Sequence, residues 1–123
     1  MRYLVTLSYI DPGPLLAARQ VSGLIKGESS PTLEALAGLE SEGKIRGGIA
    51  AGARGGAFVL DAESNEEVDR ILMGLPGWDV WEVEVTPLLG FDTRREHERR
   101  LGEALLQQQP GDAPTTSGQG PTY

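Results

Sequence analysis

Two residues of opposite charge, Lys26 and Glu28, lie where an apolar helical pattern is interrupted. A carboxylate can move a proton, and a lysine can stabilise the negative charge that develops when a proton leaves a carbon beside a carbonyl group. Gly27 and the serines at 29 and 30 leave room for a ligand to approach. The pair therefore predicts a catalytic proton-transfer site. The alternative is a solvated lysine and glutamate, since both residue types are common on protein surfaces.

A second group of polar residues alternates along two expected strands. Glu82 and Glu84 share one face of the last strand, and Thr6 and Ser8 share one face of the first. If these faces line an enclosed space, Glu84 is a candidate catalytic carboxylate, and Thr6 and Ser8 are candidate substrate-binding residues. If the faces meet solvent, the two glutamates only add charge to the surface. Both interpretations remain open.

Three larger side chains are further candidates for ligand binding. Arg54 lies in a glycine-rich stretch and could bind a carboxylate or a phenolate, although the spacing of the glycines is not that of a phosphate loop and equally indicates a turn between strands. Trp81 is a candidate substrate-binding residue at the start of the last strand. Together with Trp78 it could instead form a subunit contact, which is a common place for exposed aromatic residues.

Composition excludes several classes of site. The chain has 123 residues, as expected for one domain, and its formal charge is −7 from eighteen acidic and eleven basic residues. A nucleic-acid surface needs a dense basic patch, so no nucleic-acid partner is expected. With no cysteine and a single histidine, His97, we expect no metal site and no cofactor. No apolar run approaches the ~20 residues of a membrane helix, and no signal peptide is visible. We therefore expect a cytoplasmic protein without a membrane contact.

The hydrophobic pattern predicts four strands and two helical regions. Alternation over 3–10, with Tyr3 and Tyr9 on the core face, predicts the first strand. The other elements are a helical arm over 15–43 with a break near 27–31, strands over 45–51 and 53–62, a helix over 64–74, and a strand over 79–86. Ser64 and Glu67 have the spacing of a capping box at the start of the second helix.

This order predicts an α+β domain over 1–90, in which two helices cover one face of a four-stranded antiparallel sheet. The opposite face then needs a cover, and a second copy of the chain is the simplest one, so we expect a homodimer at minimum, or a higher homo-oligomer. Residues 91–109 predict a charged helical extension, since Glu96 and Arg100 are four positions apart. Residues 110–123 are rich in Pro, Gly, Ser and Thr, a composition that favours disorder.

Three stretches in the second half of the chain resemble the muconolactone isomerase family: Asp61–Asn65, Ile71–Pro76 and Glu84–Leu88. The segment Glu42–Lys44 is also similar to the residues that end the first helix in that family. The resemblance implies a ferredoxin-like βαββαβ subunit whose sheet pairs with that of a second copy into a dimeric α+β barrel. It also implies a cofactor-independent proton shift in a small unsaturated lactone.

The resemblance leaves two functions open. Ile25 and Lys26, followed by Glu28, match the family's first helix, which favours a cofactor-independent isomerase or cyclase acting on a small carboxylated or phenolic molecule. Family members carry His, Arg and Asp on the polar face of the first strand, whereas this chain has Leu4, Thr6 and Ser8 there. That difference favours the alternative, a non-catalytic dimeric barrel that binds a small molecule or serves in assembly.

Overall fold

The structure, a computed structural model, describes residues 1–10 and 17–108. The chain divides into two units, Met1–Leu88 and the part from Leu89 onward. The first unit contains a four-stranded sheet and its helices, and the second contains the helix α4 (Phe91–Gln108). The disorder predicted for 110–123 lies outside the described residues.

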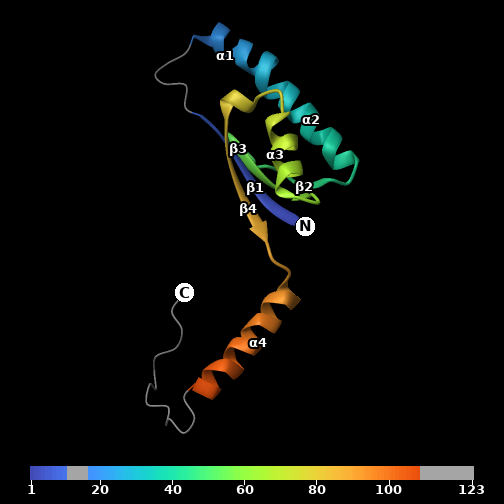
Figure 1. Ribbon diagram of the computed structural model, residues 1–123. Helices are drawn as coiled ribbons and strands as arrows, with labels where there is room; N and C mark the ends of the chain where they lie inside the picture. The colour runs from blue at the N-terminus through green and yellow to red at the C-terminus, as the bar shows by residue number, and fades with distance from the viewer. Residues whose placement is uncertain (11–16, 109–123) are drawn as a thin grey trace. The chain divides into compact units, whose positions relative to one another are not determined.

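The sheet of the first unit is entirely antiparallel, with strand order β2-β3-β1-β4. Its strands are β1 (Arg2–Tyr9), β2 (Ile45–Ile49), β3 (Gly55–Asp61) and β4 (Trp81–Leu88). The first strand is central, and Val5 pairs with Phe58 of β3 on one side and with Val85 of β4 on the other. Because both neighbours run against β1, they begin beside the end of β1 (Figure 1).

Helices α2 (Ser30–Ser41) and α3 (Asn65–Met73) lie on one face of this sheet (Figure 1). Alternate residues of the central strand, including Tyr3, Val5 and Leu7, are buried against them. From the helices, Leu36, Val68 and Leu72 complete the core. The α+β fold with two helices on one face of a four-stranded antiparallel sheet is therefore confirmed.

The start of α3 uses the predicted serine cap, with one difference. Ser64 Oγ accepts a hydrogen bond from the Glu67 backbone N–H at 3.2 Å. The Glu67 carboxylate accepts from the N–H of Glu63 at 3.2 Å, one residue before the position that a reciprocal capping box requires. It also lies 3.6 Å from Lys44 Nζ, which links the helix to the start of β2.

Near the predicted break at 27–31 the helical arm changes its hydrogen-bond geometry but does not end. Helix α1 (Ala18–Leu24) continues through a π-helical segment, Ile25–Ser29, into α2. Pro31 explains the π geometry, because proline has no N–H and its ring clashes with the carbonyl four residues back. The N–H of Ser30 instead bonds to the carbonyl of Ile25, five residues earlier. Such a bulge carries the chain past a proline without ending the helix.

The arm ends at Gly43, as the sequence predicts. Gly43 has φ +79°, a conformation that glycine adopts without steric cost. Its N–H bonds to the Glu40 carbonyl, and the N–H of Lys44 bonds to that of Leu39. These two bonds are those of a Schellman motif.

Two strands begin two residues later than the sequence predicts. The last strand begins at Trp81 rather than at residue 79, since Trp78–Val80 form a 3-10 turn. The third strand begins at Gly55 rather than at 53. Helix α1 has no buried residue, and Val21 in it and Ile25 just after it are both exposed.

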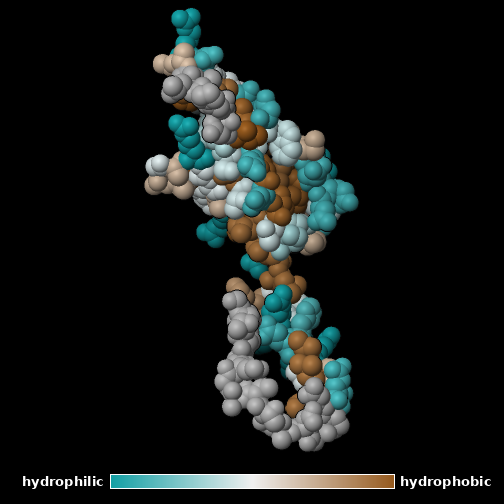
Figure 2. All heavy atoms as spheres, turned by 90° about the vertical axis from the view of Figure 1, so that its left-hand side faces the viewer, coloured by the Kyte–Doolittle hydropathy of each residue, from teal (hydrophilic) through white to brown (hydrophobic). Residues whose placement is uncertain are grey.

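Among the described residues of the first unit, no helix lies on the face of the sheet opposite α2 and α3 (Figure 1). Leu4, Ala57 and Val59 lie on this open face of the sheet, where Leu4 of β1 pairs with Val59 of β3 and Thr6 pairs with Ala57. Figure 2 shows that apolar atoms are exposed in the middle of the unit, between polar side chains. The open face is thus the surface for which the sequence predicts a second copy.

Helix α4, in the second unit, is held by charge pairs on its own surface. Arg99 lies 2.7 Å from Glu96 and 2.6 Å from Glu103, and Arg100 lies 3.1 Å from Glu96. The hydrogen bonds from Arg99 and Arg100 lower the pKa of the Glu96 carboxyl, and Glu96 raises the pKa of Arg99. His97 is exposed on the same helix, as expected.

Candidate functional site

A half-open cavity of about 520 Å³ lies between the helical arm and the edge of the sheet where β1 ends. Its wall is largely apolar and comes from both elements. The apolar side chains are Ile10, Val21, Leu24, Ile25, Leu33 and Val80. Tyr9, Ser29 and Ser30 add polar groups, and Arg54 and Asp79 add one charge of each sign. Apolar cavities of a few hundred Å³ with a small number of placed polar groups are typical small-molecule sites.

Backbone hydrogen bonds fix Arg54 and Asp79 on opposite sides of the end of β1. The N–H of Tyr9 donates to the Arg54 carbonyl at 3.1 Å. The N–H of Ile10 donates to the carbonyl of Val80, the neighbour of Asp79, at 3.0 Å. Neighbouring strands lie about 4.8 Å apart, so the two charged residues are anchored roughly 10 Å apart across β1.

The arm closes the other side of the cavity through its π-helical segment. Ile25 and Ser29 line the cavity from that segment. On the same arm, Thr32 is fully buried and donates a hydrogen bond to the backbone carbonyl of Glu28, four residues earlier, at 2.7 Å. The π-helical turn is therefore part of the wall of the site, as is common for such bulges.

Lys26 and Glu28 lie on this same segment but do not line the cavity. Lys26 is exposed, and Glu28 is half-buried. Each is one position away from a lining residue, Lys26 beside Ile25 and Glu28 beside Ser29. Their catalytic role stays a prediction.

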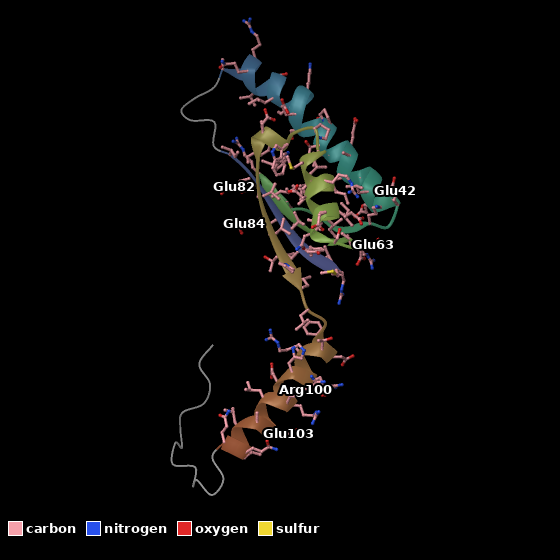
Figure 3. All side chains as sticks on the ribbon, in the orientation of Figure 1. Glu42, Glu63, Glu82, Glu84, Arg100 and Glu103 are labelled. Atoms are coloured by element: carbon pink, nitrogen blue, oxygen red, sulfur yellow. The ribbon has the colours of Figure 1, made fainter. Side chains whose placement is uncertain are left out.

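The predicted residues Thr6, Ser8 and Glu84 gather on the open face of the sheet. Thr6 pairs directly with Glu84, and Ser8 pairs with Glu82. Figure 3 shows Glu82 and Glu84 on β4, pointing away from the helices. The structure thus brings these four residues together, but on the face opposite to the cavity, where a second copy would have to enclose them.

Trp81 is buried rather than exposed to a ligand. It is 5% exposed and stacks on Tyr9, with ring centroids 4.3 Å apart. Its indole nitrogen has no hydrogen-bond acceptor among the residues that the structure describes. Because Tyr9 lines the cavity, Trp81 forms a second layer behind that wall. Trp78, by contrast, is 42% exposed.

Sequence reasoning missed Asp79, which it placed inside the last strand. A signal for it exists in the order of the strands. Arg54 directly precedes β3, and Asp79 lies shortly before β4. When both strands pair antiparallel with β1, the residues before them must meet beside its end. Charged residues that come just before the two strands flanking a central strand are therefore expected to lie at the same edge of the sheet.

The described residues contain neither a cluster suited to a metal ion nor a membrane-spanning helix. Within residues 1–10 and 17–108, no group of three His, Asp or Glu side chains is placed to hold a metal ion. None of the helices in those ranges is long and apolar enough to cross a membrane.

Comparison with known proteins gives the family. Residues 1–93 match the family model described as muconolactone delta-isomerase. Among solved structures, the chain is similar to a crystal structure of muconolactone isomerase, with a TM-score of 0.57 and 24% sequence identity over 73% of this chain and 90% of that chain. At this identity the structural likeness shows the shared fold. No curated protein gives a significant match. Because the family model spans most of the 123 residues, the chain belongs to the muconolactone delta-isomerase family.

Proposed function

We propose that this protein is a muconolactone isomerase-like, cofactor-independent isomerase or cyclase that transfers a proton within a small carboxylated or phenolic molecule. The observation that carries the proposal is the apolar cavity with Arg54 on its wall, in a chain of this family. A guanidinium can hold a carboxylate through two parallel hydrogen bonds. An apolar wall excludes water, which strengthens the electrostatic stabilisation of an enolate.

The direct test is to incubate the purified protein with muconolactone in deuterated water and to follow the substrate by proton NMR. Proton transfer replaces a carbon-bound hydrogen with deuterium and shifts the double bond, so both events appear in the same spectrum. Catalysis without added metal, and after treatment with a chelator, is the expected result. A protein that leaves muconolactone and related unsaturated lactones unchanged would contradict the proposal.

Arg54→Ala is expected to weaken the binding of a simple carboxylate, benzoate, by about tenfold. An exposed charge pair contributes modestly, and a bidentate geometry adds to it. Isothermal titration calorimetry measures the change. Arg70→Ala is the matched control, because Arg70 is an exposed arginine of α3 that does not line the cavity. An equal loss of affinity in both variants would show that Arg54 contributes only general charge.

We also propose a homodimer formed through the open face of the sheet. Leu4, Ala57 and Val59 form its apolar centre, and two such faces packed together would enclose Thr6, Ser8 and Glu84. Leu4→Arg is expected to weaken the dimer by about a hundredfold, since a charged side chain in the apolar centre of the interface loses its hydration when the two faces pack together. Light scattering at micromolar concentration is the measurement, with Glu34→Arg on the exposed side of α2 as the control. A stable wild-type monomer would contradict this prediction.

A second candidate function is a non-catalytic binding module. It is favoured by one observation, that none of Lys26, Glu28 and Glu84 lines the cavity. On this alternative the cavity still binds a small acid through Arg54, but no proton is transferred. Ligand binding by calorimetry without deuterium incorporation would support it.

A further inference from the structure

The cavity holds two opposite charges that are kept apart. Arg54 and Asp79 both line it, yet no ion pair joins them among the described residues. Their backbones are anchored on either side of Tyr9 and Ile10, roughly 10 Å apart by two strand spacings. A ligand that lies across the end of β1 would therefore meet a guanidinium at one end and a carboxylate at the other.

The space between the two charges suits an apolar body. Val21, Leu24, Ile25 and Leu33 line it from the arm, and Val80 lines it from the turn before β4. The volume of about 520 Å³ lies in the usual range for small-molecule sites and exceeds that of one aromatic ring with its substituents. A planar ring would also contact the side chain of Tyr9.

We propose that the ligand of this cavity is a monoanionic hydroxy acid, with its carboxylate on Arg54 and its hydroxyl donating a hydrogen bond to Asp79. This inference rests on the proposed function in that it places the ligand in the same cavity. A carboxylate accepts a hydrogen bond from a neutral hydroxyl strongly. A second negative charge at that end of the ligand would be repelled by Asp79. The residue thus selects hydroxy acids against dicarboxylic acids of the same length.

Three rigid acids test the selectivity: 4-hydroxybenzoate, benzoate and terephthalate. They share one ring and one carboxylate, and differ only at the opposite end, which bears a hydroxyl, a hydrogen or a second carboxylate. The wild-type protein is expected to bind 4-hydroxybenzoate most tightly and terephthalate most weakly. The quantity to compare between variants is the ratio of the Kd for terephthalate to the Kd for 4-hydroxybenzoate, measured by calorimetry at low ionic strength. Comparing the ratio removes any effect that a substitution has equally on the Kd values of both acids.

Asp79→Asn is expected to lower this ratio about tenfold, because the amide removes the repulsion and still accepts a hydrogen bond. Asp69→Asn, an exposed position of α3 outside the cavity, should leave the ratio unchanged. An unchanged ratio in Asp79→Asn, an equal change in Asp69→Asn, or no binding of any of the three acids would overturn the inference.

The hydroxy-acid site and the isomerase activity can be supported or refuted independently. A ratio that falls in Asp79→Asn, in a protein that does not convert muconolactone, supports the hydroxy-acid site and refutes the isomerase. Conversion of muconolactone with an unchanged ratio supports the isomerase and refutes the hydroxy-acid site.

Discussion

Gly77→Ala is expected to lower the free energy of unfolding by about 3 kcal/mol, the upper part of the usual range for overpacking a buried site. Gly77 is buried in the turn between α3 and β4, and its φ of −99° is accessible to any residue. The cost is therefore steric. A methyl group there would collide with Thr32 Oγ1 and would come within 2.9 Å of Trp81 Nε1 and 3.0 Å of the Glu28 carbonyl oxygen.

None of these three neighbours can move freely. Thr32 is fully buried and hydrogen-bonded to the Glu28 carbonyl, and Trp81 is stacked on Tyr9. The added methyl group must push the arm away from the turn. Since Ser29 follows Glu28 and lines the cavity, the same variant is expected to weaken benzoate binding.

Urea unfolding measures the stability change, with Gly38→Ala as the matched control. Gly38 lies inside α2, and nothing lies within 4 Å of the place where its Cβ would be. Alanine there should stabilise the protein by up to about 1 kcal/mol, because alanine favours a helix more than glycine does. If Gly77→Ala unfolds at the wild-type urea concentration, the turn does not hold the arm as described.

The sequence predicts β1, β3 and α3 well because each of those elements is amphipathic. Alternation in β1 separates Tyr3, Val5 and Leu7 from Leu4, Thr6 and Ser8, and the structure divides the two sets between the two faces. Such a pattern reports directly on which side is buried. The three family-like stretches lie at the cap of α3, at the end of that helix and the turn after it, and at the end of β4.

The helical arm over 15–43 was predicted less well, because the local sequence does not show what a helix packs against. Pro31 after Ser30 resembles the start of a new helix, and only the i to i−5 hydrogen bond of Ser30 lets one helix continue past it. The apolar residues of α1 fit a core-facing stripe. In the structure Val21 instead faces a cavity, an environment that periodicity cannot distinguish from a core.

The candidate site was predicted only in part, since it is assembled by tertiary structure. Arg54 was singled out from its glycine-rich surroundings, and it lines the cavity. Asp79 is distant from it in sequence and is brought opposite to it by the strand order alone. The remaining candidates fall into three other places: the π-helical segment for Lys26 and Glu28, the open face for Thr6, Ser8 and Glu84, and the core for Trp81.

Lys26→Ala and Glu28→Gln are each expected to lower the rate of muconolactone conversion by about a hundredfold, the typical loss when one positioned acid–base group is removed. Both residues belong to the π-helical segment that closes the cavity, next to the lining residues Ile25 and Ser29. Neither change should alter Tm, because Lys26 is exposed and the hydrogen bond of Thr32 reaches the backbone of Glu28 rather than its side chain.

Deuterium incorporation followed by NMR measures the rate, and Glu34→Gln, on the exposed face of α2, controls for the loss of a helix carboxylate. A loss of rate confined to Lys26→Ala and Glu28→Gln would assign the proton transfer to the π-helical segment and imply that it turns toward the bound ligand. Full activity in both variants would refute that assignment. The chemistry would then fall to Arg54 and Asp79, which are the two charged side chains on the cavity wall in the part of the chain that the structure describes.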